Sequence, residues 1–77
     1  MPVVRVTFSG DWSGVLPAAR MRREVPVAPR TSIKDLIESL GVPHTEVGAI
    51  ETPADGPVRL EARVEQDLDL TVRPVPA

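Results

Sequence analysis

Hydrophobic and polar residues alternate with a period of two in two segments at opposite ends of the chain. In residues 3–8, Val4, Val6 and Phe8 fall on one side of an extended backbone, and polar residues fall on the other. Residues 68–73 alternate in the same way. This period is typical of half-buried β-strands. Because these two segments have the most regular apolar alternation, we expect them to lie side by side in the centre of a sheet.

Weaker patterns predict three further strands. Residues 21–27 alternate again, but Pro26 lies within them. Proline cannot donate to a strand ladder, so this strand is expected at the edge of a sheet or with the Pro26 nitrogen facing outward. Residues 47–51 predict a short strand, and Val58 and Leu60 a brief one after a proline- and glycine-rich turn.

A helix is predicted over residues 33–40. Four residues at helical spacing form one apolar stripe: Ile33, Leu36, Ile37 and Leu40. Ser32 is a favourable N-cap, and Asp35 lies three residues later, where a carboxylate can reach back to the cap. Gly41 suits the left-handed C-terminal cap, and Pro43 prevents continuation.

The order of elements is strand, strand, helix, strand, short strand, strand. A single helix with one apolar stripe must cover one face of a sheet. The sequence therefore predicts an α+β fold of the β-grasp (ubiquitin-like) type, with a mixed four- to five-stranded sheet covered by one helix at about residues 33–40. Residues 1–77 are expected to form a single domain.

Composition narrows the classes of function. The net charge of −2 argues against a nucleic-acid-binding protein, which needs a surplus of basic residues to contact phosphates. The chain has no cysteine and one histidine, so thiol chemistry is excluded and a transition-metal site is improbable. Without a signal peptide or a membrane-length apolar run, we expect a cytoplasmic protein. Lys34 is the only lysine among nine basic residues, which is typical of GC-rich bacterial genomes.

His44 and a group of acidic residues are the candidates for a catalytic or metal site. His44 could act as a general base, but no companion residue lies at a suggestive position, and it is expected to be a loop residue bonded to backbone. Glu65, Asp67 and Asp69 are acidic, but their spacing does not match a calcium loop. We expect Asp69 to point outward and all three to be solvated. No catalytic, cofactor-binding or metal-binding residue is therefore predicted.

The candidate partner-binding residues are one tryptophan and several arginines. Trp12, in a polar loop, either marks an exposed binding surface or folds back over the core, and the sequence favours neither. Arg20, Arg22 and Arg23 form a basic run that can contact phosphates or an acidic partner, although such runs are usually solvated. The exposed face of the sheet adds four residues, Arg5, Thr7, Thr71 and Arg73.

The stretch TSIKDLIESLGVPHTEV, residues 31–47, resembles one family over its whole length, and LTVRPV, residues 70–75, is similar to the last strand of that family. The family is the ubiquitin-like domain that usually precedes the Mut-seven C-terminal (Mut-seven-C) RNase domain. It is related to the thiamine and molybdopterin sulfur carriers (ThiS/MoaD). The sequence departs from the family pattern at Asp67-Leu68, where a Gly-Asp pair is usual, and at residues 53–57, where Asn-Gly is usual.

The resemblance implies a non-catalytic interaction module without cofactors, associated in cis or in trans with a Mut-seven-C-type RNA-processing nuclease. Two alternatives remain open at this point. A sulfur carrier acts through a C-terminal Gly-Gly, whereas residues 73–77 read Arg-Pro-Val-Pro-Ala, so this function would require residues beyond Ala77. An RNA-binding domain would use the basic run from Arg20 to Arg23 and would bind in a salt-sensitive manner.

Overall fold

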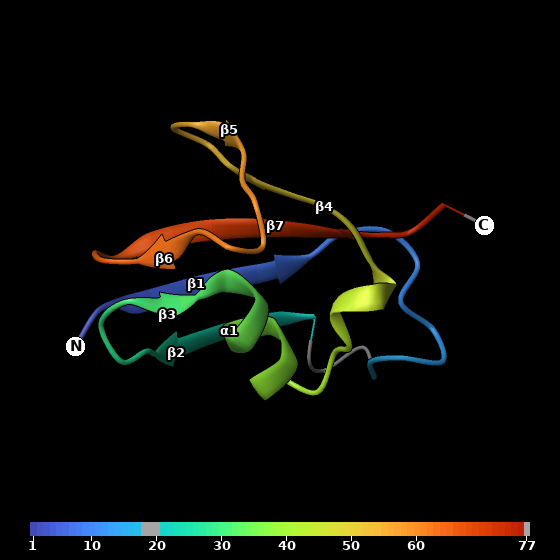
Figure 1. Cartoon of the computed structure of the whole chain (residues 1–77). Coiled ribbons are helices and arrows are strands. Elements are labelled where there is room, and N and C mark those ends of the chain that lie inside the picture. The colour runs from blue at the N-terminus through green and yellow to red at the C-terminus, as the bar shows by residue number, and fades with distance from the viewer. Residues whose placement is uncertain (18–20, 77) are drawn as a thin grey trace.

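A mixed five-stranded sheet forms the body of the molecule (Figure 1). The computed structural model describes residues 1–17 and 21–76. The strands of the sheet are β1 (Val3–Phe8), β2 (Arg22–Pro26), β4 (Val47–Thr52), β5 (Gly56–Pro57) and β7 (Leu68–Pro74), in the spatial order β2-β1-β7-β4-β5. β1 and β7 are parallel neighbours, and the other pairs are antiparallel. The prediction that the first and last strands lie side by side within the sheet is confirmed.

The elements between β2 and β4 form a second layer on one face of this sheet (Figure 1). They are β3 (Thr31–Ser32), the helix α1 (Ile33–Ser39) and a short 3₁₀ helix, η2 (His44–Glu46). Strand β3 pairs with β6 (Arg63–Val64), which comes later in the chain. The arrangement is the β-grasp fold that the sequence predicts.

Helix α1 begins at the predicted residue, Ile33, and ends one residue before the predicted end, with Leu40 as its C-cap. The Ser32 hydroxyl accepts a hydrogen bond from the Asp35 backbone N–H at 3.1 Å, which satisfies one of the unpaired donors of the first turn. Gly41 follows with a φ of +93°, in the left-handed region that ends helices.

The brief strand predicted at Val58 and Leu60 is wrong. The short strands are β5, just before these residues, and β6, just after them. Val58 N–H still donates to the Ile50 carbonyl of β4 at 2.8 Å, but the chain from Leu60 to Ala62 runs past the start of α1. There the carbonyls of Leu60 and Ala62 accept hydrogen bonds from the backbone N–H groups of Lys34 and Ile33, at 3.0 and 2.9 Å. This segment thus supplies partners for two N–H groups at the start of the helix, a role that does not require it to pair as a strand.

The core lies between α1 and the sheet. Among the described residues, its buried side chains are Val4, Val6, Phe8, Trp12, Leu16, Val27, Ile33, Leu36, Ile37, Leu40, Val42, Ile50, Val64, Leu70 and Val72. All four residues of the predicted helical stripe are among them, and so are the three residues of β1 predicted on its inward side, Val4, Val6 and Phe8. Within residues 1–17 and 21–76, no helix is long and apolar enough to cross a membrane.

Strand β2 lies at one edge of the sheet, as its proline predicts. Phe8 N–H donates to the Met21 carbonyl and Val27 N–H donates to the Pro2 carbonyl, at 2.8 and 2.9 Å. Backbone groups alternate along an antiparallel pair, so these two bonds fix which residues of β2 face β1. Pro26 falls at an outward-facing position, and its lack of an N–H group costs no bond to β1.

Candidate functional site

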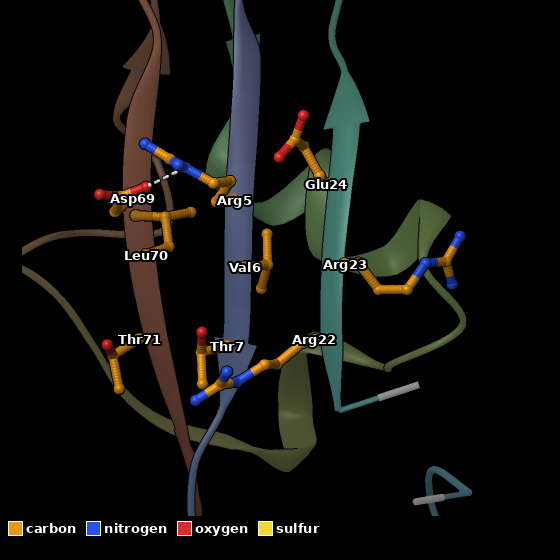
Figure 2. A pocket seen from close by; sticks show the side chains of 9 residues that line it. All are labelled: Arg5, Val6, Thr7, Arg22, Arg23, Glu24, Asp69, Leu70 and Thr71. Atoms are coloured by element: carbon orange, nitrogen blue, oxygen red, sulfur yellow. Dashed lines mark hydrogen bonds and ion pairs between the residues drawn. The ribbon is translucent and has the colours of Figure 1, made fainter. Parts of the chain in front are cut away.

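The face of the sheet opposite α1 carries charged and hydroxyl side chains from β1, β2 and β7 (Figure 2). Parallel pairing of β1 with β7 places Arg5 beside Asp69 and Thr7 beside Thr71. Alternation along β1 turns these side chains away from the core, because Val4, Val6 and Phe8 are buried on the other side. The sheet face is therefore a polar surface, and the predicted residues of β1 and β7 do lie on it together.

Two arginines of the sheet face form ion pairs with acids on neighbouring strands. Arg5 Nε lies 2.8 Å from Asp69 Oδ1, and Arg73 donates from Nε and Nη2 to Glu51 Oε1 at 3.0 and 2.7 Å. The Arg5 and Asp69 side chains remain 68% and 51% exposed. Ion pairs this exposed contribute little to folding, typically about 0–1 kcal/mol. Their main consequence is that the positive charge of Arg5 and Arg73 is locally balanced.

The basic run does not form one continuous patch. Figure 2 shows Arg22 extending from β2 across the sheet face toward Thr7, whereas Arg23 extends in the other direction, away from β1. Successive residues of a strand point to opposite faces, which accounts for this separation. Arg20, the third residue of the predicted run, lies outside the described residues.

Trp12 is buried, which decides between the two interpretations of its loop. The side chain is only 2% exposed and packs edge-on against Phe8, with ring centroids 5.3 Å apart and an interplanar angle of 79°. Its Nε1–H donates to the Ser9 carbonyl at 3.0 Å. The indole is a lid over the core, so the interpretation of Trp12 as an exposed contact is wrong and its side chain does not belong to the sheet face.

The comparison with protein families covers the whole chain. The family model for the Mut7-C ubiquitin domain matches residues 1–77. The chain belongs to the Mut7-C ubiquitin family. Neither a curated protein nor a solved structure matches it. The resemblance to this family, which is sharpest in residues 31–47 and covers nearly the whole chain, is thereby confirmed.

His44 of this Mut7-C ubiquitin domain has a different partner from the one predicted. Its Nδ1 lies 2.6 Å from Glu38 Oε2, where a bond to backbone was expected. An ionised carboxylate only accepts, so Nδ1 carries the proton and donates it. The pair joins the end of α1 to η2. The hydrogen bond from the His44 side chain is the main cause that lowers the pKa of Glu38 below its ordinary value.

We expect His44→Ala to raise the pKa of Glu38 toward its ordinary value. A carboxyl whose pKa is lower in the folded state stabilises the fold above its unfolded-state pKa, and this contribution is lost as the pH falls through the folded-state pKa. The stability deficit of the variant should therefore shrink on acidification. NMR titration of the Glu38 carboxyl carbon, with urea unfolding over the same pH range, measures both effects. Thr45→Ala, at an exposed neighbour, is the control, and an unchanged Glu38 titration would contradict the assignment.

The predicted acidic group has specific partners. Asp67 Oδ1 accepts the Val3 backbone N–H at 2.8 Å, and Asp69 is paired with Arg5. Asp69 points outward, as predicted, but neither carboxylate is merely solvated. Among residues 1–17 and 21–76, no group of three or more acidic or histidine side chains could hold a metal ion.

Two acidic residues of the sheet face, Glu24 and Glu51, are not among the residues predicted from the sequence. Glu24 lies opposite Arg5 in the β1–β2 register, and Glu51 binds Arg73 from β4. The sequence could have indicated Glu24, because it lies two residues from Arg22 in one strand and alternation places both on the same face of the sheet. Finding Glu51 required the register of β4 on β7, which shifts at a bulge between Val47 and Ala49.

Proposed function

We propose that this domain is a non-catalytic interaction module that docks a Mut-seven-C-type nuclease domain, in cis or in trans. The observation that carries the proposal is the family match over residues 1–77. In this proposal the domain binds the nuclease, and the nuclease supplies the chemistry.

The sheet face is the surface proposed to make this contact. Its central ion pair joins Arg5 to Asp69, and both side chains are more exposed than buried. Complementary charges at an interface fix the relative orientation of two proteins and raise their rate of association. Hydroxyl groups on Thr7 and Thr71 add uncharged donors and acceptors between the charges. The face therefore offers orientation-dependent contacts that contribute little to folding, so they can be changed without loss of the fold.

The test measures binding of the full chain to the Mut-seven-C-type nuclease domain of the source organism by isothermal titration calorimetry. Arg5→Glu introduces a carboxylate beside Asp69, and we expect it to weaken binding by about tenfold or more. Lys34→Glu makes the same change of charge on the exposed side of α1 and is the matched control. A double substitution, Arg5→Asp with Asp69→Arg, restores an ion pair in the reversed orientation.

Three results would decide against the proposal or its surface. If the nuclease domain does not bind the chain, the proposed function is wrong. If Lys34→Glu weakens binding as much as Arg5→Glu does, the effect reflects net charge and not the sheet face. If an adenylating enzyme binds in place of the nuclease, the sulfur-carrier alternative is favoured.

A further inference from the structure

Strand β2 presents backbone donors along its outer side that bond to nothing within residues 1–17 and 21–76. The hydrogen bonds that flank the β1–β2 pair place Val25 and Arg23 at the positions bonded to β1, so Arg22 and Glu24 direct their N–H and C=O groups outward. No other strand of the described chain lies beyond β2. Pro26, at the next outward position, offers a carbonyl but no N–H. The free edge therefore has a defined length and ends at a proline.

A groove runs along this edge between β2 and α1. Val25 of β2 and Val27 just after the strand line it on one side, and Leu36 of α1 and its C-cap Leu40 line it on the other. Its rim carries both charges, with Arg23 on the strand side and Asp35 on the helix side. Figure 2 shows the Arg23 side chain directed beyond β2, away from β1. A strand added to β2 would place alternate side chains over this groove and the others on the sheet face.

A second copy of the chain is a poor occupant of this edge. Two β2 strands paired antiparallel about Glu24 would place this residue directly opposite its own copy, and like charges directly opposite each other are destabilising. Pro26 would face Arg22 of the other copy and would supply no donor there. Pairing about Arg23 would instead set the two Arg23 side chains opposite each other. A strand of different sequence can therefore match the charges of β2 better than a second copy can.

We propose that β2 binds an extended segment of a partner protein as an additional antiparallel strand. The side chains of Val25, Glu24, Arg23 and Arg22 specify the sequence pattern of this segment. From its N-terminus to its C-terminus, the segment reads apolar, basic, acidic, acidic. The apolar side chain lies beside Val25 over the groove, and the basic one faces Glu24. The two acidic ones face Arg23 and Arg22. Backbone hydrogen bonds hold the segment, and its side chains confer specificity.

This inference rests on the proposed function, because it names the edge through which an interaction module would take a partner segment. Its test does not depend on the nuclease. The probe is a synthetic peptide with blocked ends, Thr-Thr-Ile-Lys-Glu-Glu-Thr-Thr, which carries the proposed pattern. The control peptide, Thr-Thr-Ile-Glu-Lys-Lys-Thr-Thr, has the same backbone and inverted charges.

Amide hydrogen exchange of the isotope-labelled protein is the first measurement. We expect the first peptide to slow exchange of the Arg22 and Glu24 N–H groups and to leave the helix amides unchanged. The charge-inverted peptide should bind about tenfold more weakly. Equal binding of both peptides, no binding of either, or protection confined to other elements would overturn the proposal.

Substitutions at the edge provide the second measurement. Glu24→Pro removes the outward N–H and leaves the bonds to β1 intact, whereas Glu24→Ala removes only the charge. We expect the proline variant to bind the first peptide at least about tenfold more weakly than the alanine variant. Pro26→Ala adds an outward N–H and should strengthen binding severalfold. Pro26→Ala keeps the proposal testable even if Glu24→Pro does not fold, because binding that is not strengthened in Pro26→Ala would contradict strand addition.

The outcomes separate this inference from the proposed function. If the nuclease domain binds Glu24→Pro and Glu24→Ala equally, the proposed function stands and strand addition at β2 fails. If the first peptide binds as expected and the nuclease domain does not, strand addition stands and the proposed partner fails. If single-stranded RNA, and not the peptide, shifts the resonances of Arg22 and Arg23, these residues bind phosphate and the proposal is overturned.

Discussion

Replacing Trp12 with alanine is expected to remove about 3–5 kcal/mol of folding free energy. The indole is 2% exposed and packs edge-on against Phe8. Alanine would leave a cavity between the loop and the sheet and would also remove the Nε1–H bond to the Ser9 carbonyl. Small domains are stable by only about 5–15 kcal/mol, so this single change would remove a large part of the total.

Urea unfolding followed by circular dichroism measures this loss without requiring a tryptophan signal. Trp12→Phe is the control, because it keeps an aromatic ring against Phe8 and loses the hydrogen bond and part of the volume. We expect its cost to be about 1–2 kcal/mol. If Trp12→Ala costs less than about 1 kcal/mol, the loop is not a lid over the core, and Trp12 returns as a candidate contact residue.

The ambiguity of Trp12 illustrates where the sequence stops being informative. Residues 9–14 are mostly polar or glycine, and this composition predicts a loop but not the direction of its one large side chain. Phe8 decides the direction, because it ends β1 on the buried face within reach of the indole. That contact depends on the path of the loop, which local sequence patterns do not encode.

Periodicity predicts faces reliably and partners poorly. The alternation of β1 correctly places Arg5 and Thr7 on the exposed face, since side-chain parity depends only on local backbone geometry. The acidic partners of the arginines depend on which strands are neighbours and in which register. Asp69 is distant from Arg5 in the sequence, and only the parallel β1–β7 pairing brings the two together.

The short strands also could not be predicted from local sequence patterns. Strands β3 and β6 have two residues each, too few to show any alternation. Val58 and Leu60 imitate a strand because both pack partly against the core, although they lie in a connecting segment. Helix α1 is predicted almost to the residue because its cap, its stripe and its terminating glycine are all local signals.

Gly48→Ala is expected to lower the free energy of unfolding by roughly 2–3 kcal/mol, which is the upper part of the range for adding volume at a crowded position. Gly48 is the extra residue at the bulge between β4 and β7, where the register shifts from Val47 to Ala49. A Cβ atom on Gly48 would lie 2.5 Å from the Pro74 carbonyl oxygen and 3.0 Å from Val75 Cα. Both are backbone atoms, so no side-chain rotation relieves the contact, and the end of β7 must move.

This movement has a local signature. Val75 N–H donates to the Glu46 carbonyl at 3.1 Å, just beyond the end of β7. In Gly48→Ala we expect faster hydrogen exchange at Val75 together with a melting temperature lower by about 10 °C. Ala49→Ser, at the exposed neighbouring position, is the control and should change stability by less than about 0.5 kcal/mol.

The two readouts distinguish a local contact from a general weakening of the sheet. If Gly48→Ala lowers the melting temperature while exchange at Val75 stays at its wild-type rate, the strain is relieved elsewhere in β4. If neither changes, the backbone at Pro74 does not approach Gly48 closely enough to exclude a Cβ atom. The expected combination means that a glycine in β4 fixes where the chain leaves β7, and thus the direction in which residues 75 and 76 depart from the sheet.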